Sequence, residues 1–157
     1  MNNLTVEKAT IMDVPYIIKI IQDKINWFKQ NNIKQWTKYH VYDSLYFLSQ
    51  INKGVNELYV LRSKECNVCG CMMVDKETYK DAYKIKHLMS NEKGGGNLLI
   101  NKAIERCKQD HKKYLRLDCV ASNGKLIMYY LSKGFKDKGI FDDNNGYTYT
   151  LFELEIE

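Results

Sequence analysis

One stretch of the sequence decides the fold class: residues 114–135, YLRLDCVASNGKLIMYYLSKGF. Its first part, residues 114–120, alternates apolar with polar side chains and predicts a β-strand. Residues 123–131 predict a helix, and Gly134 and Phe135 open a further strand. A strand that leads directly into a helix is the unit from which parallel sheets are built.

A second strand–helix unit precedes this stretch. Residues 82–88 predict a strand, residues 91–96 (NEKGGG) form a glycine-rich turn, and a helix follows. The side chains expected to face inward on that helix are Leu98, Leu99, Ala103 and Cys107. Two such units predict a partly parallel sheet with helices on both of its faces.

The first part of the chain adds a strand and two helices. Residues 4–9 predict the first strand, and Asp13 is expected to cap a helix that carries isoleucines at helical spacing. A second helix is predicted at residues 42–52, and Gly54 ends it.

The remaining strands complete the sheet. Residues 57–62 and 67–74 predict two strands joined by the short turn 63–66, so this pair must be antiparallel. Residues 147–156 predict the last strand. We therefore expect a single domain over residues 1–157 in the α/β (α+β) class, with a mixed, mostly antiparallel central sheet and helices on both faces.

Composition and charge set the broad class. Hydrophobic residues make up 45% of the chain and charged residues 27%, which suits a globular domain. The formal charge of +5 comes from scattered lysines, without a long run of like charge, so nucleic-acid binding is not expected. No apolar stretch approaches the roughly 20 residues that span a bilayer, and residues 1–7 lack the features of a signal peptide. We expect a cytoplasmic protein with no membrane partner.

The cysteines include the pattern Cys66-x-x-Cys69-x-Cys71, which resembles part of a zinc site. A structural zinc site normally has four ligands, and no second Cys/His cluster is present. Cys69 and Cys71 also fall in a predicted strand, where a reduced cysteine packs as a small apolar side chain. No bound metal is expected.

Gly94, Gly95 and Gly96 lie between a predicted strand and the start of a helix. Glycine permits positive φ and close approach of the backbone to a ligand. The first N–H groups of a helix lack partners within it, and the helix dipole adds partial positive charge, so the turn is suited to phosphate. A flexible turn without a ligand is the alternative. Two known phosphate loops are excluded, because no Gly-Lys-Ser/Thr follows and the G-x-G-x-x-G pattern fails at Leu99.

Together these segments resemble the GNAT superfamily of N-acetyltransferases. That family carries Gln/Arg-x-x-Gly-x-Gly/Ala between its fourth strand and third helix; residues 91–96 match both small positions, and Asn91 replaces Gln or Arg. Residues 97–100 (NLLI) are similar to the start of the family's third helix. Residues 115–123 are similar to its fifth strand and the Asn that follows. Residues 126–135 carry the family's pattern of Tyr-Tyr, three residues and Gly-Phe at every fixed position.

The resemblance implies an N-acetyltransferase that moves an acetyl group directly from acetyl-CoA to a primary amine of a small molecule or protein. The pyrophosphate of acetyl-CoA would bind the glycine turn, and its pantetheine arm would pair with the end of the preceding strand. Asn123 would contact the pantetheine, cap its helix, or do both. The implied cofactor-binding residues are Leu88, Met89, Ser90, Lys93, Gly94, Gly95, Gly96, Asn97, Asn123 and Tyr129.

Tyr130 is the candidate catalytic residue. When an amine attacks the thioester, the departing sulfur gains negative charge, and a nearby phenol can donate a proton or a hydrogen bond to it. The family places this tyrosine four residues before the Gly of Gly-Phe, which is Tyr130 here; Tyr129 competes for the role, and a plain core aromatic is the alternative. The amine must also lose a proton, for which Glu77, His87 and Asp118 are candidates, although a surface or structural role is the better expectation for each of them.

Other hypotheses remain open. The same fold without catalysis would be an acyl-CoA-binding or sensor module, and a nucleic-acid-binding domain would need a contiguous Lys/Arg face. Trp27, Trp36 and Tyr39 are candidates to line an acceptor pocket, and for Trp27, on the Ile-rich helix, a place in the core is the favoured alternative. A homodimer that pairs through the last strand, residues 147–156, is a further possibility.

Overall fold

The structure, a computed structural model, describes residues 3–33, 42–65, 67–143 and 146–157. Its helices and strands follow the order expected from the sequence, with one turn of 3-10 helix added before the first α-helix. They are β1 (Thr5–Lys8), η1 (Ile11–Asp13), α1 (Val14–Gln30), α2 (Ser44–Lys53), β2 (Glu57–Arg62), β3 (Val68–Asp75), β4 (Ala82–Ser90), α3 (Gly95–Gln109), β5 (Tyr114–Val120), α4 (Gly124–Ser132), β6 (Lys136–Asp142) and β7 (Thr148–Glu155).

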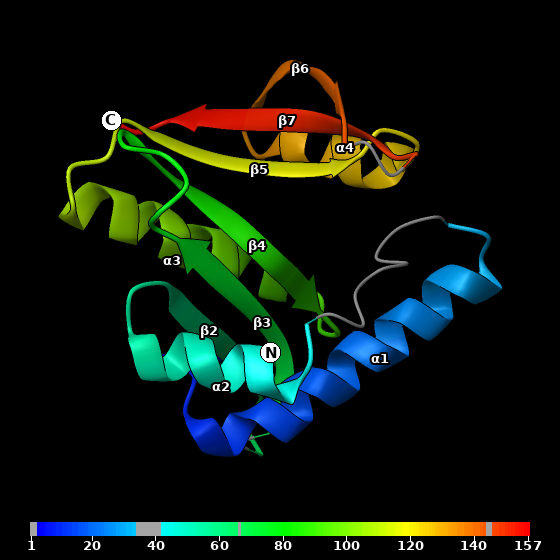
Figure 1. The fold of residues 1–157 in the computed structure, drawn as a ribbon, viewed down its shortest axis with the longest axis vertical. Helices are drawn as coiled ribbons and strands as arrows, with labels where there is room; N and C mark the ends of the chain where they lie inside the picture. The colour runs from blue at the N-terminus through cyan, green and yellow to red at the C-terminus, as the bar shows by residue number, and fades with distance from the viewer. Residues whose placement is uncertain (1–2, 34–41, 66, 144–145) are drawn as a thin grey trace.

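The strands form one seven-stranded sheet in the order β1-β2-β3-β4-β5-β7-β6 (Figure 1). Neighbouring strands are antiparallel except β4 and β5, which are parallel. The parallel pair follows from the crossover through α3, which returns the chain to the same end of the sheet. The mixed, mostly antiparallel sheet expected from the sequence is confirmed.

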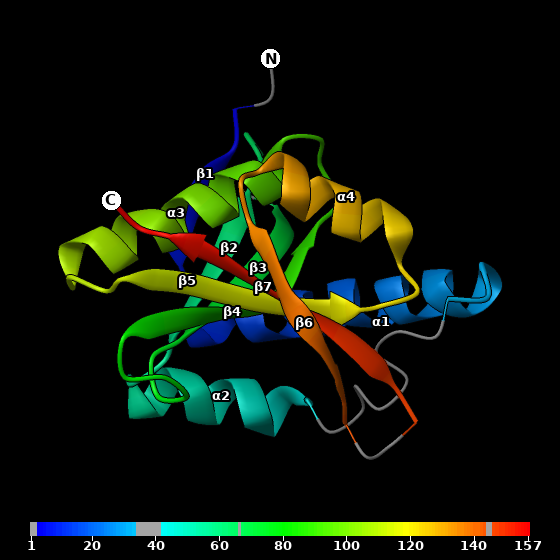
Figure 2. The ribbon, with the colours of Figure 1, turned by 90° about the horizontal axis from the view of Figure 1, so that it is seen from above.

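Helices cover both faces of this sheet. Figure 2 shows α1 and α2 on one side and α3 and α4 on the other. On the first side, Ile17 of α1 and Phe47 of α2 belong to one buried cluster with Met73 of β3. On the second side, Leu99 of α3 is buried in a cluster with Phe152 of β7. Each such side chain contributes roughly 1.5–3 kcal/mol by leaving water, so apolar burial holds both helical layers to the sheet.

The start of α1 differs from the expected capping. Asp13 occupies the N-cap position but makes no side-chain capping bond to the helix. Its carboxylate accepts hydrogen bonds from the Thr10 N–H (2.8 Å) and from the Arg62 guanidinium (2.8 Å). The predicted capping role of Asp13 is therefore wrong, because an arginine on β2 competes for the carboxylate.

The inward face of α3 also differs at one position. Leu99, Ala103 and Cys107 are buried as expected, but Leu98 is 37% exposed and Ile100 is buried instead. Successive residues in a helix are turned by about 100°, so the residue on each side of Leu99 points in a different direction. The buried face of α3 includes Ile100 and not Leu98, so the prediction for Leu98 is wrong.

The last strand, β7, does not lie at an edge of the sheet. It pairs with β5 on one side and with β6 on the other. Both of its hydrogen-bonding edges are occupied within the chain, which contradicts the possible dimer contact through this strand. Homodimerisation by another surface stays a prediction.

The cysteines of β3 pack as the strand assignment predicts. Cys69 belongs to the buried cluster on the α3 side, and Cys71 to the cluster on the α1 side. Residues two apart in a regular strand share a face, but a β-bulge at Cys69 breaks the alternation of β3. The two thiols therefore point to opposite faces of the sheet. Within the described residues, no group of three or more His, Cys, Asp or Glu side chains is placed to hold a metal ion. No described helix is long and apolar enough to cross a membrane.

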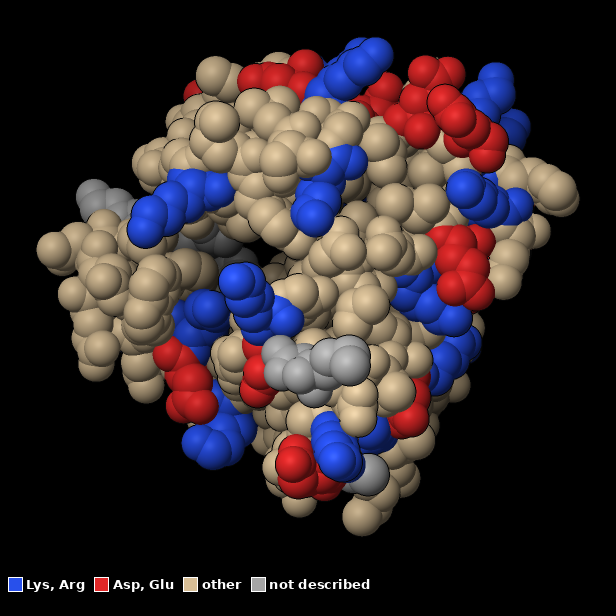
Figure 3. Space-filling model, turned by 180° about the vertical axis from the view of Figure 1, so that it is seen from behind, with Lys and Arg blue, Asp and Glu red and all other residues tan. Residues whose placement is uncertain are grey.

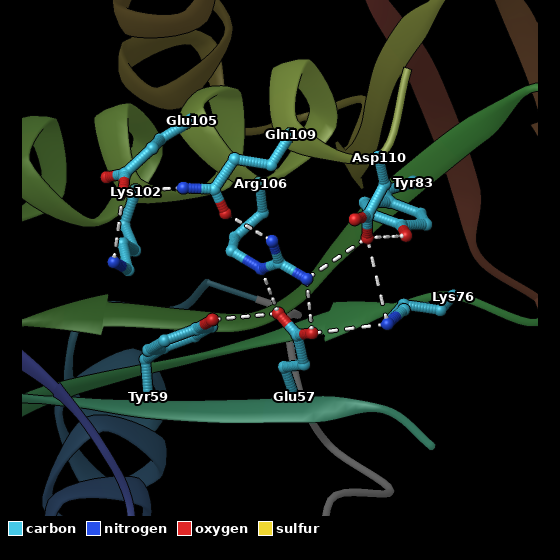
Figure 4. Close-up of polar contacts among 9 residues, drawn as sticks. All are labelled: Glu57, Tyr59, Lys76, Tyr83, Lys102, Glu105, Arg106, Gln109 and Asp110. Atoms are coloured by element: carbon cyan, nitrogen blue, oxygen red, sulfur yellow. Dashed lines mark hydrogen bonds and ion pairs between the residues drawn. The ribbon is translucent and has the colours of Figure 1, made fainter. Parts of the chain in front are cut away.

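A network of charges fixes the C-terminal half of α3 to the sheet (Figure 4). Glu57, at the start of β2, is 6% exposed and accepts two hydrogen bonds from the Arg106 guanidinium, at 2.7 and 2.9 Å. Tyr59 (2.7 Å) and Lys76 (3.2 Å) donate to the same carboxylate. Burial by itself would raise the pKa of Glu57, but the hydrogen bonds from these three side chains lower it to about 2.

Replacing Glu57 with Gln should lower the free energy of unfolding by about 3 kcal/mol at neutral pH, because Arg106 would lose the countercharge it holds against the sheet. The carboxylate's contribution is present above its ordinary pKa of 4.5 and is lost as the pH falls through about 2. In urea titrations, the difference between wild type and Glu57→Gln should therefore shrink over that range. Glu105→Gln, at an exposed carboxylate on the same helix, is the control and should show no such change; equal behaviour of the two variants would contradict the prediction.

Candidate functional site

β4 and β5 pair for only part of their length. Their parallel ladder joins residues 82–84 to residues 114–116, whereas β4 stays paired with β3 as far as Ser90. Figure 1 shows β4 running away from β5 beyond that point. Among the described strands, the last part of β4 has no partner on this edge. A ligand that carries amide groups could pair there as an added strand would.

A β-bulge in β4 lies within the diverging part. Met73 pairs with Lys86 and Cys71 with Met89, so β4 contains one more residue than β3 over this interval. His87 lies inside the bulge with a φ of 57°, in the left-handed region that few non-glycine residues adopt. Bulges bend a strand and increase its twist, so this one helps to direct the end of β4 away from β5.

The turn after β4 favours glycine at one position and requires it at the next. Gly94 has a φ of 83° and precedes the first residue of α3. Gly95 is buried, and a Cβ atom there would overlap the side chains of Ser90 and Leu61. The Ser90 hydroxyl is itself held in the turn, since it donates to the Glu92 carbonyl (2.7 Å) and accepts from the Glu92 N–H (3.1 Å). The turn is therefore packed closely against β2 and β4.

The N-terminus of α3 presents open hydrogen-bond donors. The Gly95 N–H bonds to the Glu92 carbonyl (3.1 Å) and the Leu98 N–H to the Gly94 carbonyl (3.2 Å). Within the part of the chain that the structure describes, the N–H groups of Gly96 and Asn97 have no such partner. The dipole of this 15-residue helix adds partial positive charge at the same place. The geometry is suited to a phosphate group.

α4 brings further predicted residues to the same opening. Asn123 is the N-cap of α4, and its side chain accepts a hydrogen bond from the Leu126 N–H (3.2 Å). The capping role is confirmed, while contact of Asn123 with a ligand stays a prediction. Tyr129 reaches the glycine turn, because a Cβ atom on Gly96 would lie 3.1 Å from its hydroxyl.

The ring of Tyr130 is in the core, and its hydroxyl faces the opening. The residue is 5% exposed, and its ring centroid lies 6.0 Å from that of Phe135 and 5.7 Å from that of Phe152. Its hydroxyl has no hydrogen-bond partner among the described residues. Among the described residues, only Ser63 has a side-chain oxygen or nitrogen that is both inaccessible to solvent and without a hydrogen-bond partner. Because the Tyr130 hydroxyl also has no such partner, it must be accessible to solvent.

The electrostatics of Tyr130 favour a donor. Burial raises the pKa of its phenol well above the ordinary value of 10.0, and nearby groups that include Asp118 raise it further. The phenol therefore stays protonated throughout the neutral range and can donate a hydrogen bond to a ligand.

These elements surround a cavity of about 430 Å³, within the range of small-ligand sites. It opens on the face shown in Figure 3, where Lys and Arg side chains border a hollow. Residues from α1, β4, the glycine turn and α4 line it: Lys24, Trp27, Phe28, Ile33, Leu88, Met89, Ser90, Glu92, Gly94, Gly96, Asn123, Lys125, Leu126, Tyr129 and Tyr130.

The cavity thus brings together most residues that the sequence analysis predicted for cofactor binding and for catalysis. Three of the predicted cofactor-binding residues do not line the cavity: Lys93, Gly95 and Asn97. Lys93 is exposed on the turn, and Gly95 is buried beneath it. Gly95 contributes through its missing side chain, and Asn97 through its open N–H group.

The contribution of α1 to the cavity differs from the favoured sequence-based prediction. Trp27, expected in the core, is 49% exposed and lines the cavity with its neighbour Phe28, so the core prediction is wrong. The helical spacing could have indicated this. Phe28 lies seven residues after the buried Ile21 and therefore on the same helix face, whereas Trp27 is turned about 100° away from that face. Trp36 and Tyr39 lie outside the described residues.

None of the three candidate bases lines this cavity. Glu77 is exposed in the turn between β3 and β4. Asp118 forms an ion pair with Lys84 (2.7 Å). His87 is 8% exposed, and burial lowers its pKa to about 3, so its imidazole is only weakly basic.

No protein-family model matches the chain, and no curated protein sequence matches it. Solved structures do match. A GNAT-family acetyltransferase from Listeria monocytogenes has a TM-score of 0.76 and 21% identity, over 97% of this chain and 94% of the other. An N-acetyltransferase from Staphylococcus aureus has a TM-score of 0.76 and 15% identity over 99% of both chains. The spermidine/spermine N-acetyltransferase of Vibrio cholerae has a TM-score of 0.69 and 14% identity, over 97% and 93%.

At these identities the likeness establishes the fold. The chain has the fold of the GNAT acetyltransferases, as the resemblance of its sequence implied. Which reaction the site supports must be argued from its own residues, because one fold can serve more than one function.

Gly95→Ala should destabilise the protein by about 1–3 kcal/mol, because the added methyl group would push into Ser90 and Leu61 at the base of the turn. Gly124→Ala is the matched control. Gly124 is also the first residue of a helix, and a Cβ atom there meets nothing within 4 Å, so no destabilisation is expected. Urea titrations measure both; a Gly95→Ala variant as stable as wild type would show that the turn is not closely packed.

Proposed function

We propose that this chain is an acetyltransferase that transfers the acetyl group of acetyl-CoA to a primary amine. One observation carries the proposal: the unpaired edge of β4, the open N-terminus of α3 and the Tyr130 hydroxyl meet around one cavity. A thioester on a long arm with amide groups, ending in a pyrophosphate, needs a hydrogen-bonding groove with an anion site at its end. The shared fold of the GNAT acetyltransferases supports the same function.

The residues present fit this cosubstrate. The N–H groups of Gly96 and Asn97 would hold the pyrophosphate at the positive end of α3. Lys24 and Lys125 line the same cavity and add positive charge to its wall. The free edge of β4 at residues 88–90 would pair with the amides of the pantetheine arm.

Tyr130 would stabilise the leaving group. Bound acetyl-CoA supplies a thioester whose carbonyl carbon an amine can attack. The Tyr130 hydroxyl would donate a hydrogen bond to the sulfur as negative charge develops there. Because the pKa of Tyr130 is raised and an ordinary thiol has a pKa of about 8.5, full proton transfer from the phenol is uphill. The contribution of Tyr130 is therefore a hydrogen bond to the thiolate rather than its neutralisation.

The proposed location is the cytoplasm. Four described cysteines are reduced and buried: Cys69, Cys71, Cys107 and Cys119. Reducing compartments maintain cysteines in this state, which supports the proposal.

Gly94→Asp should weaken binding of acetyl-CoA by about tenfold or more, because it adds negative charge at the helix N-terminus. Gly94→Asn is the matched control, since Asn has the same size and also tolerates the positive φ of this position. It should bind acetyl-CoA nearly as wild type does. Isothermal titration calorimetry gives the Kd values; equal weakening in both variants would argue against an anion site at the turn.

Tyr130→Phe should lower kcat by about 100-fold and leave the Kd for acetyl-CoA nearly unchanged, because it removes one hydrogen bond made to the leaving sulfur. Release of free thiol during incubation with a panel of amines measures the rate. Tyr129→Phe is the comparison and should lose much less of kcat. Tight binding of acetyl-CoA by wild type with no thiol release from any amine would instead favour a non-catalytic acyl-CoA-binding module.

A further inference from the structure

His87 has an unusual backbone conformation for its position. The described non-glycine residues with positive φ are Asn32 (55°), His87 (57°) and His111 (56°). Asn32 and His111 are exposed and follow the ends of helices, whereas His87 is 8% exposed and lies inside a strand. Such a conformation persists in a strand only where the surrounding structure holds it.

Contacts from α2, and from Tyr42 just before it, hold the His87 side chain. The Tyr46 hydroxyl is hydrogen-bonded to the His87 Nε2 atom at 3.0 Å. The rings of Tyr42, Tyr46 and Phe47 meet the imidazole edge to face, with centroids 4.7, 5.5 and 5.5 Å away. The main chain is held as well, because the Cys71 thiol donates to the His87 carbonyl (3.3 Å).

This contact is not a proton relay. Burial, with the positive charge of Lys86, lowers the pKa of His87 to about 3. Burial also raises the pKa of Tyr46 to about 12. Both groups are therefore neutral over the whole physiological range, and the hydrogen bond between them is a fixed structural link.

The bulge that contains His87 sets the direction of the residues after it. Leu88, Met89 and Ser90 line the cavity, and Leu88 packs with the cluster on the α3 side, opposite to the side chain of His87. A change of conformation at His87 would turn these residues and close or slip the bulge, because register along a strand is shared by all later residues.

We propose that His87 is a positioning residue: its link to Tyr46 and the rings of α2 holds the β4 bulge, and thereby the groove for the pantetheine arm. The inference rests on the proposed function, since that groove matters only if an acyl-CoA is bound. α2 thus supports the cosubstrate site from the opposite face of the sheet.

The glycine turn is held by different contacts. The Ser90 hydroxyl bonds to Glu92, and the Asn91 N–H bonds to the Cys69 carbonyl (2.8 Å). Loss of the His87 link should therefore damage the groove and spare the anion site. Two probes separate these sites: coenzyme A, which needs both, and phosphoadenosine diphosphate, the half of coenzyme A that ends at the diphosphate.

The test measures the Kd of each probe by calorimetry for wild type, His87→Gly and Tyr46→Phe. Glycine keeps the left-handed backbone without strain and removes the side-chain link, although it also makes the main chain freer. Tyr46→Phe removes one hydroxyl and leaves the residues of β4 unchanged. We expect the Kd for coenzyme A to rise about tenfold in His87→Gly and by a smaller factor in Tyr46→Phe. The Kd for phosphoadenosine diphosphate should stay within about twofold of wild type, less than 0.5 kcal/mol.

His111→Gly is the matched control, because it changes the same residue type at nearly the same φ away from the groove. It should alter neither Kd. An unchanged Kd for coenzyme A in His87→Gly, or an equal loss for both probes, would overturn the positioning role. If wild type itself binds neither probe, the proposed function fails and this inference fails with it.

Discussion

The separation of β4 from β5 after three paired residues is the constraint on which the rest of the site depends. If the two strands paired to their ends, the N–H and C=O groups of residues 88–90 would be satisfied within the sheet. The same parallel connection passes through α3, so the N-terminus of that helix follows directly at the end of β4. One feature of topology therefore places an open strand edge beside an open helix end.

α3 is held at both of its ends, by close packing at the first end and by an ion pair at the other. At the N-terminus, the missing side chain of Gly95 lets the helix approach Ser90 and Leu61. At the other end, Arg106 is bonded to the buried carboxylate of Glu57. Contact at one end and charge pairing at the other limit how far the helix can tilt, so its first N–H groups keep a defined position relative to the β4 edge.

Much of the site could be predicted because its constraints act between residues close in sequence. The positive φ of Gly94, the cap at Asn123 and the four-residue spacing from Tyr130 to Gly134 are local features. The errors arose where a distant segment decided the outcome. The Asp13 carboxylate bonds to an arginine 49 positions away, and Trp27 lines a cavity whose other walls come from β4 and α4.

The sequence by itself determined the order of helices and strands, the glycine turn and the candidate acid Tyr130. Tertiary structure alone decided that β7 lies between β5 and β6, that α1 forms one wall of the cavity, and that a cluster of aromatic rings contacts His87. The physical reason is the range of the forces involved. Backbone preferences and helical spacing are set within a few residues, whereas strand order and burial depend on which distant surfaces pack together to exclude water.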